Sequence, residues 1–343
     1  MKHPYKNQPD KAFWRRAVAD RHYSAIQDLA PDLPDFENTS VATAGSCFAQ
    51  HIGRAMRSVD LSFLDLEPAP AILSKANANR LGYGLFSCRY GNIYTSRQLC
   101  QLFDEAHGLI VPQDGIWKAE GRFFDALRPG IEPEGFSSPE EVKALRKAHL
   151  ECVRKMFAEL DVFVFTLGLT ETWVSSSDGT AYPIAPGVIA GKYKPGKYRF
   201  VNLRYPDILA DMTRFRENLK SVNPGAQILL TVSPVPLAAT AGNEHVLSAT
   251  TYSKSVLRAV AGDLAHDFED VTYFPSYEII TGQPYRHGFY EPDLRSVATS
   301  GVAEVMSHLF PEITAASWHI IDQGEAADDF GYEHCEEGLL TSD

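Results

Sequence analysis

The sequence predicts a three-layer α/β/α sandwich built around a central, mostly parallel sheet of five strands. Two observations carry this prediction. The candidate strands are short, continuous apolar runs, which is the pattern of strands that a parallel sheet buries on both faces. Stretches of helical composition separate these runs, and strands separated by helices pair in parallel through right-handed crossovers. Hydrophobic residues make up 44% of the 343 residues and charged residues 22%, as is usual for a globular protein.

Five runs supply the predicted strands. In chain order they cover residues 40–44, 61–66, 161–168, 227–234 and 271–275. The third run is the clearest, because every residue from 162 to 167 except Thr166 is apolar. The fourth run repeats this pattern with Ile-Leu-Leu-Thr-Val. Both are therefore predicted to be buried on both faces of the sheet.

Helices are predicted between and after these strands. They lie near residues 47–56, 96–106, 138–160, 205–222, 249–267 and 299–309. The third is the best marked, since Ser137-Ser138-Pro139-Glu140 resembles a capping box with proline in the first turn. His149 on this helix is expected to lie on a solvated face among charged neighbours. Apart from the helix near 96–106, residues 67–135 are rich in Gly, Pro and aromatics and are predicted to form an irregular insertion.

The distribution of charge divides the chain into three parts. Residues 38–317 are predicted to form the folded domain, between an N-terminal extension over 1–37 and an acidic tail over 318–343. The net charge is −12, and the eight acids between residues 321 and 343 supply two thirds of it, which leaves only −4 for the rest. Because that stretch has few apolar residues and no Lys or Arg follows Arg295, we expect the tail to be disordered. The acidic balance argues against nucleic-acid binding and against polybasic attachment to an anionic membrane.

The sequence indicates a provisional cytoplasmic location. No apolar run reaches the roughly 18 residues needed to span a bilayer, and the N-terminus lacks the apolar core of a signal peptide. The five cysteines show no CxxC spacing, which is typical of a reducing compartment and gives no zinc signature. There is no Walker motif and no GxGxxG after a strand, so we expect neither a metal nor a nucleotide cofactor.

Ser46 is the first candidate for chemistry, because sheets of this class place ligand sites beyond the carboxyl ends of their strands. It follows the first predicted strand, where Gly45 gives the backbone freedom for a tight turn into a helix. The N–H groups of the first helical turn can then stabilise an oxyanion. Two alternatives stay open: Ser46 as an ordinary N-cap, and the thiol of Cys47 as the nucleophile.

The same turn carries a family resemblance. Residues 45–49 read Gly-Ser-Cys-Phe-Ala, the string that names the GSCFA family. The resemblance continues at the other predicted strand ends and covers roughly residues 38–310. It is carried further by residues 90–94, 167–173, 231–236, 252–254, 274–278 and 290–297. Several matching segments in the same order are more specific than the five-letter string alone.

The GSCFA family is similar to the SGNH (GDSL-like) esterases and acyltransferases. This resemblance implies a flavodoxin-like sheet with Ser46 as the nucleophile and its own N–H as one oxyanion donor. Gly91 is the best match for the glycine of the oxyanion hole, and Asn92 beside it can contribute an amide. The segment that usually carries the asparagine reads Gly-Leu-Thr-Glu over residues 168–171, which implies Thr170 or a backbone N–H as the donor.

The late Asp-x-x-His segment of those relatives is changed in this chain. It reads Asp-Leu-Arg-Ser over residues 293–296, with serine where the base belongs. We therefore expect the base to be His245 or His287, with a slight preference for His245 because its loop leaves a central strand. Asp293 or Glu171 is expected to orient the histidine.

Together these residues predict an SGNH-like serine esterase or O-acyltransferase that works through a Ser46 acyl-enzyme. Small-molecule or carbohydrate esters are the expected substrates, since Trp173, Tyr90 and Tyr94 can form an aromatic wall for a sugar ring. Arg295 can bind a carboxylate or phosphate of the substrate. The alternative function is a catalytically silent binding module that recognises a glycan or protein partner. The oligomeric state is left open.

Overall fold

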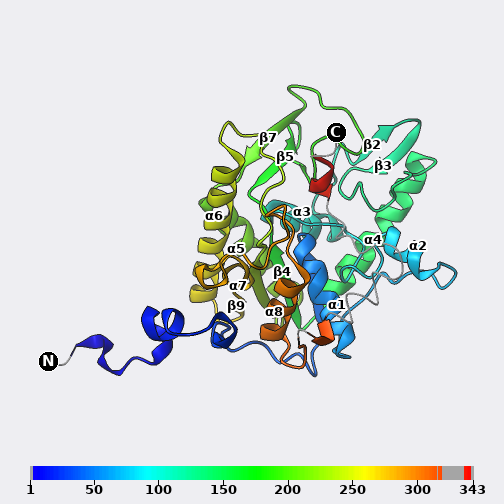
Figure 1. Cartoon of the computed structure of the whole chain (residues 1–343). Coiled ribbons are helices and arrows are strands. Elements are labelled where there is room, and N and C mark those ends of the chain that lie inside the picture. The colour runs from blue at the N-terminus through cyan, green and yellow to red at the C-terminus, as the bar shows by residue number, and fades with distance from the viewer. Residues whose placement is uncertain (1–2, 315, 319–335, 341–343) are drawn as a thin grey trace.

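The computed structural model describes residues 3–314, 316–318 and 336–340. Its centre is a parallel sheet of four strands in the order β1-β4-β8-β9 (Figure 1). The strands are β1 (Val41–Gly45), β4 (Val162–Leu167), β8 (Gln227–Val232) and β9 (Val271–Tyr273). Helices cover both faces, so the predicted α/β architecture with a mainly parallel sheet is confirmed.

The predicted fifth strand is the exception. Residues 61–66 pair with β1 only through an isolated bridge between Val41 and Phe63. Beyond this bridge the chain turns away from the edge of the sheet, because the Leu66 N–H donates to the carbonyl of Ser87 instead of to β1. A five-stranded sheet is therefore wrong, although the run lies beside β1 as a parallel neighbour.

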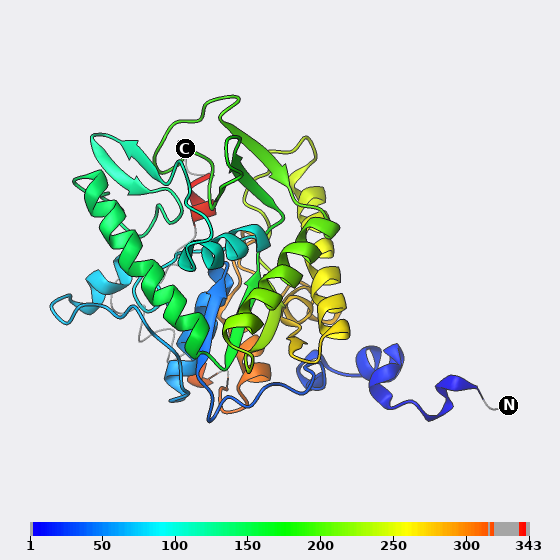
Figure 2. The ribbon, with the colours of Figure 1, turned by 180° about the vertical axis from the view of Figure 1, so that it is seen from behind.

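Side chains alternate across the sheet and build two separate cores. In β4, for example, Phe163, Phe165 and Leu167 face one core while Val162 and Val164 face the other. The first core is covered by four helices, visible in front of the sheet in Figure 2: α3 (Ser96–Ala106), α4 (Pro139–Glu159), α5 (Tyr205–Val222) and α6 (Val246–Asp267). The second is covered by α1 (Gln50–Ser58), α7 (Ser276–Thr281) and α8 (Thr299–Leu309).

The predicted helices are present, and three of them have the predicted bounds, at 96–106, 205–222 and 299–309. The start of α4 differs in detail from a reciprocal capping box. The Ser138 hydroxyl accepts from the Glu141 N–H at 3.2 Å, while the Glu141 carboxylate accepts from Ser137. The expected solvated position of His149 is wrong, because its ring is fully buried against Glu67.

Two small antiparallel sheets stand above the carboxyl end of the central sheet (Figure 1). One combines β5 (Glu171–Ser175) with β6 (Ala181–Tyr182) and β7 (Tyr198–Asn202). The other is a hairpin of β2 (Ile116–Ala119) and β3 (Arg122–Asp125) within the segment predicted to be irregular, which also contains the short helix α2 (Lys75–Arg80). These sheets form walls around the strand ends where the candidate site lies.

Short helical turns make up the ends of the described chain. Residues 3–25 contain four of them and extend away from the body in both views: Pro4–Asn7, Asp10–Ala12, Arg15–Ala19 and Tyr23–Ala25. Two further turns of this kind lie within the body, η5 (Cys47–Ala49) and η6 (Gln283–Tyr285).

Within the predicted acidic tail, residues 319–335 and 341–343 lie outside the described residues. Residues 336–340 form the turn η7 (Glu336–Leu340) against the body, so the prediction of disorder is wrong for these five residues.

Over the described ranges, no helix is both long enough and apolar enough to cross a membrane.

Candidate functional site

Ser46 lies directly beyond the end of β1. The preceding Gly45 has φ 141° and pairs with Thr166 of β4. A Cβ atom at Gly45 would lie 2.6 Å from the Thr166 carbonyl oxygen, so only glycine permits this approach. The Ser46 N–H then donates to that carbonyl oxygen at 3.3 Å. The turn thus fixes Ser46 against the carboxyl end of the neighbouring strand. The Ser46 N–H, which was expected to donate to an oxyanion, donates to Thr166 instead.

The hydroxyl of Ser46 has no structural role that the described residues explain. Ser46 occupies the N-cap position of η5, but its side chain makes no capping hydrogen bond. Its side chain is buried, and Oγ has no hydrogen-bond partner within the described part of the chain. A buried hydroxyl without a partner is unfavourable by about 1–3 kcal/mol, so it is retained for some reason other than stability. The N-cap interpretation is therefore contradicted.

A buried lysine lies next to Ser46, across Gly168. A Cβ atom at Gly168 would be only 2.9 Å from the Cβ of Ser46. The Gly168 carbonyl oxygen accepts a hydrogen bond at 2.7 Å from Nζ of Lys254, a residue of α6 that is 1% exposed. Burial lowers the pKa of Lys254 to about 8, while the nearby Glu337 and Cys47 act in the opposite direction. Residues 252–254 were predicted to match the family, but no role was predicted for Lys254.

Asn92 is held at the same rim by backbone and side-chain contacts. The N–H of Ile93 donates to the Gly45 carbonyl oxygen at 2.8 Å, which places this loop beside the nucleophile turn. The Asn92 Oδ1 accepts from Gln50 Nε2 at 3.2 Å, so its Nδ2 is turned the other way and donates to the carboxylate of Glu336. Gly91 has φ 69° and borders the same carboxylate. Gly91 and Asn92 thus lie at the rim, as the family resemblance implies.

Thr170 and Glu171 begin the wall formed by β5. Thr170 is fully buried, and its N–H donates to Ser253 Oγ at 3.2 Å. Glu171 accepts from Thr240 Oγ1 at 2.6 Å and from the Ala241 N–H at 3.4 Å, and burial raises its pKa. Its observed contacts hold the loop around residue 240 and include no histidine.

The two histidines predicted as bases are both exposed. His245 is the N-cap of α6, where its Nδ1 accepts from the Leu247 N–H at 3.1 Å. His287 lies on a loop with φ 60°. Neither ring is hydrogen-bonded to Ser46 Oγ, which has no partner among the described residues. Their catalytic role stays a prediction.

The late segment forms a tight turn that presents Arg295 to the site. Asp293 accepts from the N–H groups of Arg295 and Ser296, both at 2.9 Å, and from the Ser296 hydroxyl at 2.6 Å. Its carboxylate therefore closes the turn, and none of these contacts involves a histidine. Arg295 Nη2 lies 3.3 Å from the carboxylate of Glu337, so this arginine pairs with a carboxylate of the chain itself, and its binding of a substrate anion stays a prediction.

Of the predicted aromatic wall, Trp173 lines an open cavity, whereas Tyr90 and Tyr94 are both buried. Tyr90 is buried in the core, with its hydroxyl bonded to the Thr43 carbonyl oxygen. Tyr94 donates to Glu336 at 2.8 Å. Trp173 stands edge-on to Tyr193, with ring centroids 5.3 Å apart.

Two cavities flank the turn η7 at this rim. The first, of about 320 Å³, is lined by residues of the Gly91 and Gly130 loops together with Glu336 and Leu339. The second, of about 240 Å³, lies below Trp173 and is lined by Glu337 and Leu340 among others. Open space therefore exists on both sides of the C-terminal turn.

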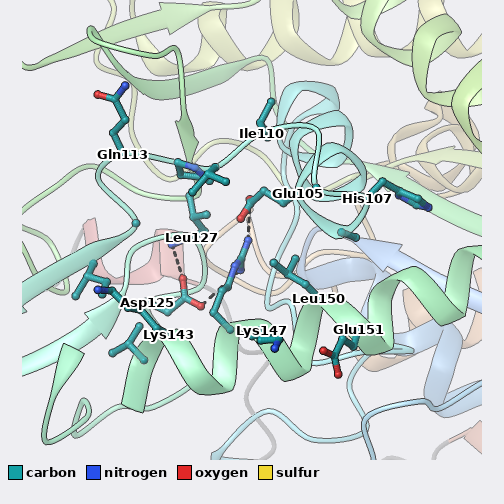
Figure 3. Close-up of a pocket in the computed structure, with 18 of the residues that line it drawn as sticks. Glu105, His107, Ile110, Gln113, Asp125, Leu127, Lys143, Lys147, Leu150 and Glu151 are labelled. Carbon is teal, nitrogen blue, oxygen red and sulfur yellow. Dashed lines mark hydrogen bonds and ion pairs between the residues drawn. The ribbon is translucent and has the colours of Figure 1, made fainter. Parts of the chain in front are cut away.

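A larger cavity, of about 660 Å³, lies elsewhere, between α3, α4 and the β2–β3 hairpin (Figure 3). Glu105 and Asp125 both pair there with the mostly buried Arg146, whose guanidinium lies 2.8 Å from the first carboxylate and 3.5 Å from the second. None of the predicted site residues lines this cavity. Within residues 3–314, 316–318 and 336–340, no cluster of three or more His, Cys, Asp or Glu could hold a metal ion.

A comparison with known protein families identifies a match for this chain. The family model described as the GSCFA family matches residues 40–309, which is well over half of the chain. The match begins at β1 and ends at α8, so it includes Ser46, Lys254 and Arg295 but stops before the turn η7. A search of curated proteins finds no match.

Proposed function

The chain belongs to the GSCFA family, and from this premise we propose that it is an SGNH-like serine esterase or O-acyltransferase. Ser46 Oγ attacks the carbonyl carbon of an acyl ester, the ester C–O bond breaks, and the alcohol leaves with a proton. Water or an acceptor alcohol then takes the acyl group from Ser46. The observation that carries the proposal is the buried, unpartnered hydroxyl at the carboxyl end of β1.

Asn92 and Tyr94 support the electrostatic part of this reaction. Both direct a donor, the Asn92 Nδ2 and the Tyr94 hydroxyl, at one carboxylate oxygen of Glu336. Donors that are already oriented toward a negatively charged oxygen are what stabilises a tetrahedral intermediate. In our proposal an oxyanion of the substrate takes the place of that carboxylate oxygen.

We assign the role of proton acceptor to Lys254. Its Nζ is bonded to the carbonyl of Gly168, the residue whose Cα packs on Ser46, and its pKa is lowered to about 8. A neutral amine can accept the hydroxyl proton, and Ser-Lys pairs carry out this chemistry on other folds. His245 and His287 remain the alternatives, and their exposure favours Lys254 over both.

A fluorophosphonate probe tests the proposal, because it forms a covalent adduct only with an activated serine. We expect mass mapping to locate the adduct on Ser46, to find none in Ser46→Ala, and to find it retained in Cys47→Ala. Loss of labelling in Cys47→Ala with survival in Ser46→Ala would transfer the nucleophile to the thiol. Absence of any adduct on the folded protein would overturn the serine-enzyme proposal.

The alternative is a catalytically silent binding module for a glycan or protein partner. The absence of a histidine bonded to Ser46 among the described residues favours it. It predicts no adduct and no ester hydrolysis, together with binding of a ligand at the rim.

For the enzyme, we further propose small-molecule or carbohydrate esters as substrates and a cytoplasmic location. The location is supported by Cys88, Cys100 and Cys152, which form no disulfide among the described residues.

A further inference from the structure

The turn η7 lies across the rim of the candidate site, between the two small sheets (Figures 1 and 2). Glu336 inserts its carboxylate between donors of the body: Oε2 accepts from the Tyr94 hydroxyl at 2.8 Å and from Asn92 Nδ2. A Cβ atom at Gly130 would come within 3.2 Å of the other oxygen, Oε1, so glycine gives that oxygen its room. The body thus has a place shaped for a carboxylate.

Glu337 makes the second anionic contact. It is 7% exposed and pairs with Arg295 Nη2 at 3.3 Å, and it also acts electrostatically on Lys254. These two cations belong to different elements, since Arg295 lies within the 293–296 turn and Lys254 within α6. A buried carboxylate between an arginine and a lysine is a charge-complementary contact, which favours binding of an anion at this place.

The two leucines of the turn point to opposite cavities. Leu339 borders the 320 Å³ cavity, which also includes Phe86 and Ile131. Leu340 borders the 240 Å³ cavity beside Trp173 and Phe200. The turn therefore lies between two cavities that contain apolar residues, and the donors of Asn92 and Tyr94 lie at its centre. We call the surface that the turn covers, together with the two cavities beside it, the groove.

We propose that this groove binds ligands that carry a carboxylate next to apolar groups, and that residues 336–340 occupy it as an intramolecular competitor. The groove is built by residues within the family match, whereas its occupant lies beyond residue 309. The sequence of this occupant, two glutamates followed by a glycine and two leucines, provides both the carboxylates and the apolar side chains that the groove contacts. Substrates of the site are then esters that bear a free carboxylate.

Occupation by the turn opposes catalysis in two ways, and this consequence rests on the proposed function. Glu336 takes the donors of Asn92 and Tyr94 that an oxyanion needs. Glu337 favours the charged ammonium of Lys254, whereas proton abstraction requires the neutral amine. Release of the turn removes both effects.

Binding of a fluorescein-labelled peptide, Glu-Glu-Gly-Leu-Leu, to full-length proteins tests the occupancy directly. In Glu336→Gln/Glu337→Gln the chain's own turn is weakened, and we expect the peptide to bind on the order of tenfold more tightly than to the wild type, where the tethered copy competes. Glu312→Gln makes the same change at an exposed glutamate outside the turn, and this variant should bind the peptide with the wild-type affinity. Adding Arg295→Gln to the double variant should weaken the peptide again by roughly tenfold.

Two results would overturn the inference: equal peptide affinity in all these proteins, or equal binding of a Gln-Gln-Gly-Leu-Leu peptide. Labelling of Ser46 by fluorophosphonate separates this failure from failure of the proposed function. Peptide binding as expected without any adduct leaves the groove in place and removes the serine chemistry. An adduct formed at the same rate in the wild type and the double variant, without differential peptide binding, removes the competitor and keeps the enzyme.

Discussion

Lys254 Nζ donates a hydrogen bond to the carbonyl oxygen of Gly168 at 2.7 Å, from inside the protein and directly beside Ser46. This contact holds the end of a flexible side chain at the carbonyl of the residue that packs on Ser46. It also satisfies a buried amine, which would be unfavourable without a partner.

Lys254→Met should therefore reduce Ser46 labelling by about 100-fold or more, because the methionine keeps the length of the side chain but cannot accept a proton. In the wild type the labelling rate should rise with pH up to about 8, as the ammonium of Lys254 loses its proton. The variant should lack this rise. Stopped-flow labelling across pH 6–9 measures both effects (about three pH units around the pKa).

Lys220→Met is the matched control, since Lys220 Nζ also donates to a backbone carbonyl, that of Ala226, at 3.0 Å. It lies on α5, away from the rim, and should leave labelling unchanged. If Lys254→Met labels at the wild-type rate with an unaltered pH profile, Lys254 is not the base.

His245→Asn separates a capping role from a catalytic one. Asparagine is among the best N-cap residues, so it should keep the bond to the Leu247 N–H and the stability of α6. We expect Ser46 labelling to stay at the wild-type level. His245→Ala should lose about 1 kcal/mol of stability, yet also label normally. Abolished labelling in the asparagine variant, with its thermal unfolding unchanged, would restore the base to His245.

The sequence was sufficient for the parts of the fold that repeat a simple pattern. The buried strands β4 and β8 are continuous apolar runs, and the bounds of α5 and α8 follow from helical periodicity. The strand β5 was missed because it follows β4 after only three residues and pairs with segments later in the chain. Such antiparallel pairing depends on tertiary contacts that a local pattern does not contain.

Attention fell on Ser46, Asn92 and Thr170 because each follows a predicted strand or lies in a segment that matches the family. Lys254 also lies in such a segment, residues 252–254, but no role was predicted for it. A lysine on a helix is usually solvated, and the burial of this one depends on how α6 packs against Gly168.

Glu336 and Glu337 were missed for a related reason, since acids in a tail of low hydrophobicity are normally solvated. The one local signal was Leu339-Leu340 immediately after them, two apolar residues in an otherwise polar stretch. Their role depends on donors contributed by residues more than 240 positions earlier, which no window along the chain can reveal.

Gly45→Ala should destabilise the fold by about 3 kcal/mol, because an L-residue is strained at φ 141° and its Cβ would press on Thr166. Urea unfolding followed by tryptophan fluorescence measures the change. Gly121→Ala is the control: this glycine also has positive φ, 81°, but a Cβ there meets nothing within 4 Å. It should lose only about 1 kcal/mol. Equal losses in both variants would show that the contact with Thr166 is unimportant.

Acid should destabilise the protein through His149, whose Nδ1 lies 2.6 Å from Glu67 inside the first core. Burial, assisted by the charge of Arg128, holds the pKa of His149 well below its ordinary value of 6.5. Burial raises the pKa of Glu67, but its hydrogen bond with His149 and the nearby Arg128 outweigh this and hold that pKa low. Below pH 6.5 the unfolded chain therefore binds a proton at position 149 that the folded protein does not. The free energy of unfolding consequently decreases as the pH is lowered.

The contribution of this one group approaches about 1.4 kcal/mol per pH unit once the pH is well below 6.5. His149→Gln can still donate to Glu67 but cannot titrate, so it should flatten the pH dependence of stability between about pH 6.5 and 5. His266→Gln, at an exposed position of α6, should leave that dependence unchanged. Urea midpoints measured at several pH values in this window compare the three proteins. A slope in His149→Gln equal to that of the wild type would mean that other groups, and not this histidine, govern the response to acid.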